Sequence, residues 1–223
     1  TDELHFWRPK DEVVEQIKVL LVTREQLVTQ KTAMGNALHA LKHKVVQTPL
    51  ANRIHEANIQ QFSDQIKDIE KELQKYIDKH PDFKKKIQLL KTIPGVGMLL
   101  AANFLVITDG FRNELTYNYR KVSSFAGFCP YEFSSGSSVY KRPRSVKYGP
   151  SRIRKLAHLA ARSVITHRKK FKQYAVMKEA EGKCKKIIQN NVANKLLKIM
   201  CAVLRTRVPY NPNHVSVHPE LLS

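Results

Sequence analysis

The sequence has no run of about 20 consecutive apolar residues, the length that a membrane-spanning helix requires. Its first residues show neither the basic nor the apolar part of a secretory signal peptide. Glycine is scarce, with 8 residues among 223, which argues against a turn-rich all-β fold or a collagen-like chain. The 3 cysteines form no C-x-x-C pair, which excludes a zinc finger and indicates free thiols in a reducing cytoplasm.

Acidic residues are scarce in only one part of the chain. Residues 1–80 hold 12 basic and 12 acidic side chains, whereas residues 81–223 hold 27 basic and 7 acidic ones and carry the whole net charge of +20. Charge concentrated in this way indicates a polyanionic partner, most often nucleic acid. An anionic membrane surface is the competing partner. Because aromatic and apolar helix positions interrupt the basic segments, we expect nucleic acid and no membrane.

The first 82 residues have the spacing of a long helical hairpin. Apolar residues recur at alternating intervals of four and three over 13–45 and again over 59–76, which is the pattern of a heptad seam. Pro49 marks the break between the two helices. The sequence therefore predicts an antiparallel coiled-coil arm over residues 1–82, which serves as a spacer, a dimerisation element or a nucleic-acid grip. Two cations interrupt the first seam, where they select a partner register or lie at an exposed edge: Arg24 and Lys31.

Residues 83–223 predict a compact helical domain with one irregular segment. The sequence Ile93-Pro94-Gly95-Val96-Gly97 separates a short basic helix from an apolar run and has the form of a helix-hairpin-helix turn. Residues 129–150 hold 3 prolines, 2 glycines and 5 serines, which indicates a loop or a poorly ordered hairpin. No βαβ pattern occurs, so the predicted fold class is all-α. Helical spacing returns in three segments: 117–126, 151–176 and 184–206.

Two features of this domain are suited to phosphate. In the turn, Gly95 and Gly97 let the backbone approach a phosphate that faces the N-terminus of the next helix; a tight turn without a ligand is the alternative. Residues 133–172, the basic tract, hold 12 Lys or Arg and no acidic residue. Six phosphate contacts would give a slope of about −5 for log affinity against log salt. We expect nucleic-acid contacts from Lys141, Arg142, Arg144, Lys147, Arg152, Arg154 and Lys155.

A serine-rich stretch, residues 134–138, lies inside the basic tract. A serine hydroxyl is a poor nucleophile unless its proton is accepted and the developing charge is balanced. Gly136 would let the backbone turn sharply beside a substrate phosphate, and the cations that follow would stabilise a pentacovalent transition state. A flexible linker has the same composition, so both interpretations stay open on the residues alone.

An ordered set of motifs resembles bacterial transposases of the insertion sequence 110 family. The long hairpin, preceded by Phe6-Trp7-Arg8-Pro9, is similar to the coiled-coil linker of that family. The resemblance covers nearly the whole chain. The other motifs that carry it are the turn at 93–97, the segment Ser124 to Pro130, the pair Ser135-Gly136, the helix start Arg152 to Leu156, and the closing pair Gly182-Lys183 with Pro209 to Pro212.

The resemblance implies an enzyme: a transposase that recombines DNA under the guidance of a structured bridge RNA. In that family a serine of the C-terminal domain attacks DNA and forms a phosphoserine link, a role that falls on Ser135, with Ser134, Ser137 and Ser138 as alternatives. Family members begin with a RuvC-like domain whose acidic residues hold divalent metal such as Mg²⁺. Nothing in this sequence corresponds to that domain, so we expect no metal site or cofactor on this chain and interpret it as a fragment or a shortened product.

The expected partners are DNA, guide RNA and at least a second copy of the chain through the arm. The expected location is the bacterial cytoplasm, in association with the nucleoid. The alternative from another functional class is a non-catalytic nucleic-acid-binding and dimerisation module.

Overall fold

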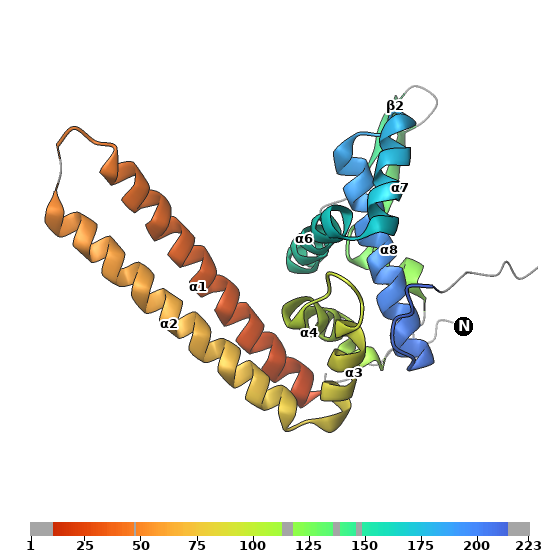
Figure 1. The fold of residues 1–223 in the computed structure, drawn as a ribbon, viewed down its shortest axis with the longest axis horizontal. Coiled ribbons are helices and arrows are strands. Elements are labelled where there is room, and N and C mark those ends of the chain that lie inside the picture. Colours follow the sequence, from red (N-terminus) through yellow and green to blue (C-terminus); the bar gives the residue numbers. More distant parts are fainter. Residues whose placement is uncertain (1–10, 47, 113–117, 136–138, 146–148, 214–223) are drawn as a thin grey trace, which may run out of the picture. The chain divides into compact units, whose positions relative to one another are not determined.

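The chain forms two compact units that divide between Lys84 and Lys85; the sequence-based boundary falls after residue 82. Both units are helical, and among the described residues the second adds a two-stranded antiparallel sheet. The predicted all-α class is confirmed, and the strands lie in the segment predicted as a loop or poorly ordered hairpin. The computed structural model (Figure 1) describes residues 11–46, 48–112, 118–135, 139–145 and 149–213.

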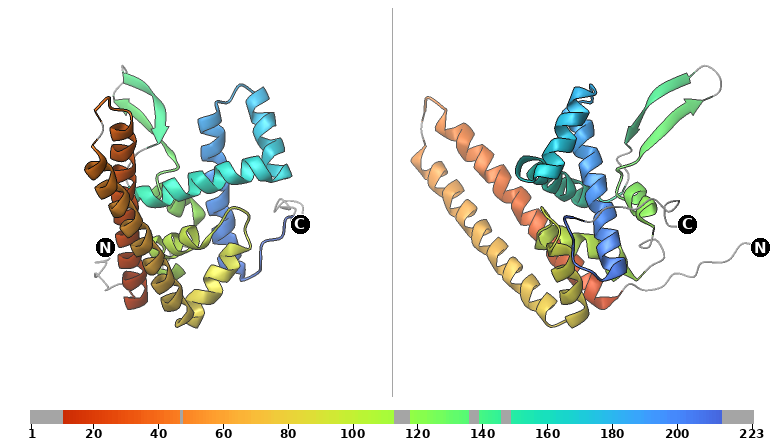
Figure 2. Two further views of the ribbon diagram at one scale, coloured as in Figure 1. Left: turned by 60° about the vertical axis from the view of Figure 1, so that its left-hand side comes forward. Right: turned by 45° about the vertical axis from the view of Figure 1, so that its right-hand side comes forward.

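The first unit contains the predicted antiparallel helical hairpin. Helix α1 spans Glu12–Lys42, helix α2 spans Pro49–Asp78, and the two lie side by side (Figure 1, Figure 2). Asp11 caps α1 by accepting a hydrogen bond from the Val13 amide at 2.8 Å. Pro49 occupies the first turn of α2, where its missing N–H removes no helical hydrogen bond. The predicted break at Pro49 is therefore the start of the second helix.

Ion pairs across this hairpin hold the two helices in register. The Arg24 guanidinium contacts Glu70 Oε1 at 2.7 Å, and Lys42 Nζ contacts Glu56 Oε1 at 3.0 Å. The Arg24 side chain is only 19% exposed, so its pair is less screened by water than the Lys42 pair. The cation inside the predicted apolar seam thus finds its partner on the other helix of the same chain.

After the arm, the chain forms short helices followed by three longer ones. The single helix predicted over 151–176 is wrong, because Arg168 has extended backbone (φ −121°, ψ 117°) and separates two helices. The Arg168 carbonyl oxygen accepts a hydrogen bond from the Lys172 amide at 2.9 Å, so Arg168 caps the start of the second of these helices. The helices are α3 (Pro81–Lys91), α4 (Met98–Ile107), the 3₁₀ helix η1 (Asp109–Phe111), α5 (Tyr119–Phe125), α6 (Ser151–His167), α7 (Lys169–Ala180) and α8 (Lys185–Thr206).

The core of the second unit lies where α6 packs on α8 (Figure 2). The buried residues of α6 include the small Ala157 and Ala161, whereas those of α8 include the larger Leu196 and Met200. Small residues on one helix and large ones on the other let the two fill the space between them without voids. Helix α4, which is the predicted apolar run, also packs on α6.

The two strands form a short hairpin that contains the serine-rich stretch. Strand β1 (Pro130–Ser135) pairs with strand β2 (Val139–Ser145) in antiparallel register. Ser135 is opposite Val139, and the register shifts between Tyr131 and Phe133, which indicates a bulge in β1. Ser135 is therefore the last residue of β1.

Gly149 fixes the end of the hairpin that returns to the helices. Its φ is +85°, and a Cβ at this position would lie 2.0 Å from the carbonyl oxygen of Phe125 at the end of α5. Arg154 Nη1 donates to the carbonyl oxygens of Ala126 at 3.2 Å and Gly149 at 3.4 Å. The end of α5, the first turns of α6 and the hairpin root, which we define as Cys129, Pro130 and Gly149, are thereby tied together.

We expect Gly149→Ala to lower the free energy of unfolding more than Gly182→Ala does. Gly182 has a similar φ of +78° but nothing within 4 Å of a Cβ, so alanine there adds only backbone strain, about 1 kcal/mol. At Gly149 the contact with Phe125 adds about 1–3 kcal/mol of overpacking. Urea unfolding followed by circular dichroism measures both changes, and equal changes would show that the contact with Phe125 is not tight.

Candidate nucleic-acid interface

Three successive helices of the second unit begin with positive charge. No acidic residue lies in the first turn of α6, α7 or α8, whereas α1 has Glu12 and Glu15 there. The N-terminus of a helix carries partial positive charge, so a cation in the first turn is disfavoured by about 0.3–1 kcal/mol. A bound anion would offset this cost. The cations concerned are Arg152 and Arg154 in α6, Lys169 and Lys170 in α7, and Lys185 and Lys186 in α8.

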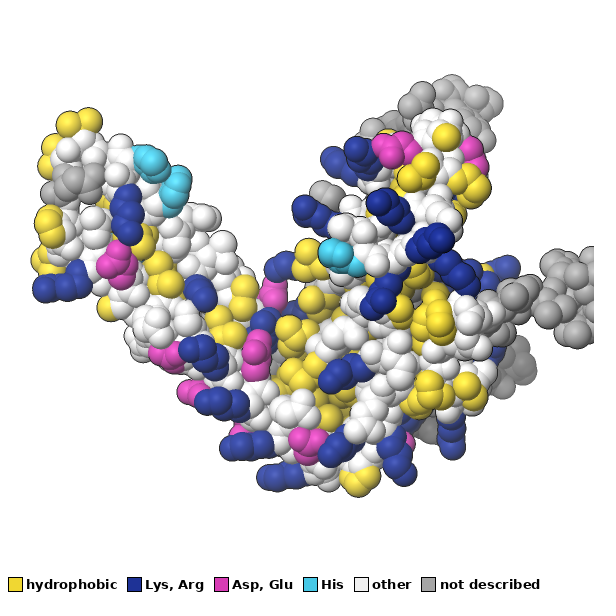
Figure 3. All heavy atoms as spheres, in the orientation of Figure 1, with side chains coloured by type: hydrophobic (Ala, Val, Ile, Leu, Met, Phe, Trp, Pro, Cys, Tyr) yellow, Lys and Arg dark blue, Asp and Glu magenta, His cyan; other side chains and the backbone are white. Residues whose placement is uncertain are grey.

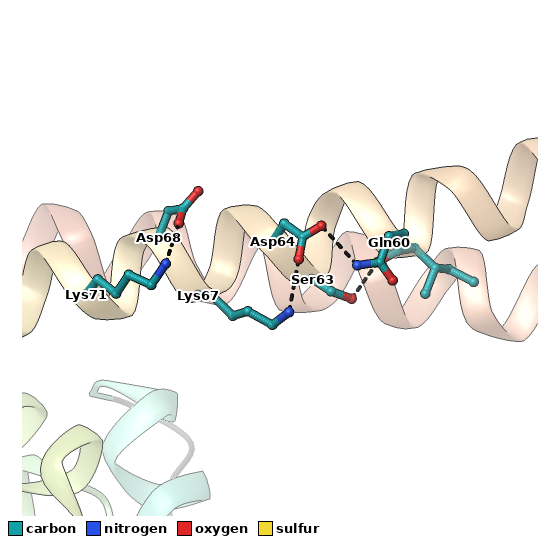
Figure 4. A network of polar contacts seen from close by, with 7 residues as sticks. Gln60, Ser63, Asp64, Lys67, Asp68 and Lys71 are labelled. Atoms are coloured by element: carbon teal, nitrogen blue, oxygen red, sulfur yellow. Dashed lines mark hydrogen bonds and ion pairs between the residues drawn. The ribbon is translucent and has the colours of Figure 1, made fainter.

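In the arm, by contrast, lysines of α2 pair with acids of the same helix. Lys67 contacts Asp64 at 3.0 Å and Lys71 contacts Asp68 at 3.3 Å (Figure 4). Gln60 also donates to Asp64 at 2.9 Å. The hydrogen bonds from Gln60 and Lys67 lower the pKa of Asp64, so this carboxylate stays charged at neutral pH. The pairs leave this face of α2 close to neutral.

The surface view shows the same contrast. In Figure 3, positive and negative side chains alternate along the arm, whereas positive ones outnumber negative ones over the second unit. Helices α6 and α8 contain no acidic residue at all. The two acids at the end of α7 contact lysines, Glu181 with Lys178 at 2.8 Å and Glu179 with Lys185 at 3.5 Å. The positive potential therefore belongs to the second unit.

The three predicted contacts in α6 have different surroundings. Arg152 is half-buried, and its Nε is shielded from solvent and has no hydrogen-bond partner among the residues that the structure describes. Such an unsatisfied donor costs about 1–3 kcal/mol. Arg154 holds backbone carbonyl oxygens at the hairpin root and so has a positioning role. Lys155 is exposed, as a phosphate contact requires.

The predicted glycine turn connects α3 and α4. Gly95 has a φ of +79°, and a Cβ there would lie 2.7 Å from Val164 Cγ1 and 3.0 Å from the Ala160 carbonyl oxygen. Glycine at this position therefore lets the turn pack on α6. Gly97 precedes the first turn of α4 and has open space around it, the geometry in which a phosphate can approach helix N–H groups. Phosphate contact at either glycine stays a prediction.

The hairpin brings the predicted nucleophile and several predicted cations onto two paired strands. Lys141 is opposite Phe133, two residues before Ser135 on β1, and Arg144 is opposite Tyr131. Arg142 lies between them on β2. From residue 131 on, the structure describes only the backbone of the strands, and the side chains of residues 131–148 lie outside the described part. For Lys147, Ser137 and Ser138 the backbone lies outside it as well. The roles of Ser135 and of the alternative Ser134 stay predictions.

Three amide side chains of α8 hold α5, α6 and the residue before the hairpin root, and sequence reasoning missed them. Asn190 Nδ2 donates to the Phe128 carbonyl oxygen at 3.2 Å. The Ser123 hydroxyl donates to Asn194 Oδ1 at 2.6 Å, and Gln189 Nε2 donates to the His158 carbonyl oxygen at 2.9 Å. The sequence feature that could have indicated them is the run Gln189-Asn190-Asn191 in a predicted helix. Asparagine is a weak helix former, so its presence there indicates a role for the side chain.

Tyr119 is the rival nucleophile in this unit. A hydrogen bond with Arg120 and the nearby charge of Lys198 lower the pKa of Tyr119. Lys198 Nζ lies 4.9 Å from the centre of the Tyr119 ring. The thiol of Cys201 is unsuited to attack, because burial raises its pKa to about 12; all three cysteines are free.

The divalent metal implied by the resemblance has no fitting ligand set in the part of the chain that the structure describes. No three His, Cys, Asp or Glu of those residues gather as a metal site would require. Likewise, no helix within the described ranges is both long enough and apolar enough to span a membrane.

Comparison with known proteins finds a family match within the second unit. Residues 87–175, from α3 to α7 and including the hairpin and α6, match the transposase IS116/IS110/IS902 family. The predicted likeness to this family is confirmed over those residues.

The chain is also similar to two curated proteins. It is 28% identical over 212 residues to the pilin gene-inverting protein of Moraxella bovis, and 27% identical over 212 residues to that of Moraxella lacunata. Each alignment covers 92% of this chain but 62% of the relative. The chain thus spans less than two thirds of the length of these relatives.

We expect the combined substitution Arg152→Gln and Lys155→Gln to reduce the salt dependence of duplex DNA binding. Removing one phosphate-binding cation should lower the steepness of log affinity against log salt by about 1. The matched control is Lys67→Gln with Lys71→Gln, which removes the same charge from α2. Fluorescence anisotropy between about 50 and 200 mM salt measures the slopes. A slope changed by the α2 pair and unchanged by the α6 pair would place the interface on the arm.

Proposed function

We propose that this chain is the DNA-binding and strand-transfer part of a DNA recombinase of the transposase class. The proposal rests on the overlap between the family-matching residues and the basic surface. The residues that match the transposase family, 87–175, contain the basic tract, the hairpin with its serines and the cation-bearing start of α6. The similarity to two proteins named for inverting a gene also supports a role in DNA rearrangement.

The proposed nucleophile is Ser135. Its Oγ loses a proton to water and forms a bond to the phosphorus of a DNA phosphodiester, while the bond from phosphorus to the leaving deoxyribose oxygen breaks and that oxygen takes up a proton. Attack by a deoxyribose hydroxyl on the phosphoserine then rejoins a strand and releases Ser135. The number of phosphoester bonds is conserved, so the exchange needs no nucleoside triphosphate. The end of β1, next to the tip of the hairpin, suits a nucleophile that must reach a phosphate.

The proposed role of the neighbouring cations is to offset the charge of the pentacovalent transition state. Lys141 pairs opposite a residue two positions from Ser135, about 7 Å away along the strand. Cations held in place beforehand stabilise a developing charge without reorganisation at the moment of reaction. The Arg154 contacts at the hairpin root would hold the strands that carry these groups.

We further propose that guide RNA is a ligand and that the arm joins two copies of the chain. The RNA follows from the family resemblance alone. Oligomerisation has its own support, because apolar side chains between α1 and α2 and at the start of α2 are more than half exposed and a second copy would cover them: Val45, Val46, Leu50 and Ile54.

The decisive experiment traps a covalent protein–DNA adduct. This chain and the longest protein that its gene encodes are mixed with labelled DNA from the ends of their own element, with and without guide RNA and Mg²⁺. We expect an adduct that survives denaturation and maps to Ser135 by mass spectrometry. Ser135→Ala should leave less than about 1% of it, because removing a nucleophile costs several orders of magnitude. Ser134→Ala and Tyr119→Phe are matched controls and should retain it.

Each other outcome changes the assignment. An adduct that persists in Ser135→Ala and is absent in Ser134→Ala or Tyr119→Phe would move the nucleophile to that residue. If DNA binds with the expected salt dependence and no protein forms an adduct, the chain is the non-catalytic nucleic-acid-binding module.

A further inference from the structure

A cavity of about 700 Å³ opens beside the hairpin root. Its walls come from three places in the second unit: the segment from Phe128 to Pro130, His158 of α6, and residues 186–194 of α8. Cavities of this size are typical of small-ligand sites. The hydrogen bonds of the α8 amides to Ser123 and to the Phe128 and His158 carbonyl oxygens fix three of its side chains in place.

Each of these amides uses one end for the fold and leaves its other end for a ligand. Asn190 and Gln189 donate to backbone oxygens through nitrogen, which leaves their side-chain oxygens as acceptors. Asn194 accepts from Ser123 through oxygen, which leaves its amide nitrogen as a donor. Asn191 also lines the cavity, is exposed, and makes no hydrogen bond to any residue that the structure describes.

The charge of the cavity selects a mostly neutral ligand with one negative group. Lys186 supplies a positive charge, and no carboxylate is among the described lining residues. His158 is neutral at pH 7, because burial first and Arg154 second lower its pKa. A metal ion would lack anionic ligands here, and a polyphosphate would meet too few cations. Fixed amide donors and acceptors beside a single cation match the base and the phosphate of one nucleotide.

We propose that this cavity binds an unpaired nucleobase of the DNA or RNA strand that the hairpin and α6 hold. The inference rests on the proposed function, since it requires a bound nucleic acid. Amides recognise bases by pairing donors and acceptors with base edges, and such readout works best on bases exposed by unpairing. Pro130 begins β1 and Ser135 ends it, so the cavity lies at most about 17 Å along the strand from the nucleophile. That is about five nucleotides at 3.4 Å each.

The test compares a strand with bases to a strand without them. The full chain is titrated against fluorescent single-stranded DNA and RNA of mixed sequence, and against an abasic DNA of the same length. We expect the strands with bases to bind about tenfold more tightly than the abasic strand. The strand, DNA or RNA, whose affinity falls more when the cavity side chains are replaced is the one whose base occupies the cavity.

Two variants test whether the preference for strands with bases arises in the cavity. Asn194→Asp keeps the oxygen that accepts from Ser123 and removes the free donor, and Asn191→Ala removes an exposed amide that the fold does not use. Both should reduce the preference for bases to about twofold or less while the abasic strand binds as before. The control Gln173→Glu adds the same charge as Asn194→Asp at an exposed site on α7 and should leave the preference unchanged.

The outcomes separate the two proposals. If no strand binds in a salt-dependent manner, the proposed function fails. If all strands bind with the expected salt dependence and the wild-type chain shows no preference for bases, the cavity is not a base site. The same conclusion follows if Asn194→Asp affects the preference no more than Gln173→Glu does.

Discussion

The hairpin that carries Ser135 depends on a backbone contact between Gly149 and the carbonyl oxygen of Phe125. Because no side chain fits between them, the chain at Gly149 lies directly against the end of α5. Hydrogen bonds from Arg154 of α6 and Asn190 of α8 hold the same root. Three helices thereby fix the base of the two-stranded element. The proposed strand transfer would need such support, since a nucleophile contributes most when it is held in attack geometry.

The two units differ in how their positive charges are balanced. In α2, lysines pair with acids one turn away, which stabilises the helix itself. The paired charges leave only a weak positive potential to attract a polyanion. In the second unit, cations occupy the first turns of α6, α7 and α8, where they oppose the helix dipole. Arg154, Lys170 and Lys185 also have partners in the fold. The other cations that reduce the stability of their own helices are better explained by a ligand, and phosphate groups have the complementary charge.

Periodicity was enough to predict α1, α8 and the part of α2 that carries the apolar seam, whereas Pro49, predicted as a break, is the first residue of α2. Periodicity failed at Arg168, where extended backbone separates α6 from α7 although the apolar spacing continues. The strands were predicted only as a loop or poorly ordered hairpin, since serine and glycine give no alternating pattern. For the site, composition indicated the basic tract and family resemblance indicated Ser135. The contact of Gly149 with Phe125 joins residues far apart in sequence, and the cavity combines Phe128, His158 and Asn190, so neither follows from local pattern.

The central claim is that nucleic acid lies on the second unit, over the hairpin and the starts of α6 and α8. Photo-cross-linking tests it directly: the full chain is irradiated with duplex DNA that carries 4-thiothymidine, and the cross-linked peptides are identified by mass spectrometry. The account predicts cross-links within residues 130–172 and in the first turn of α8, with α1 and α2 free of them. Cross-links concentrated in α1 and α2 would contradict it and make the arm the nucleic-acid-binding element.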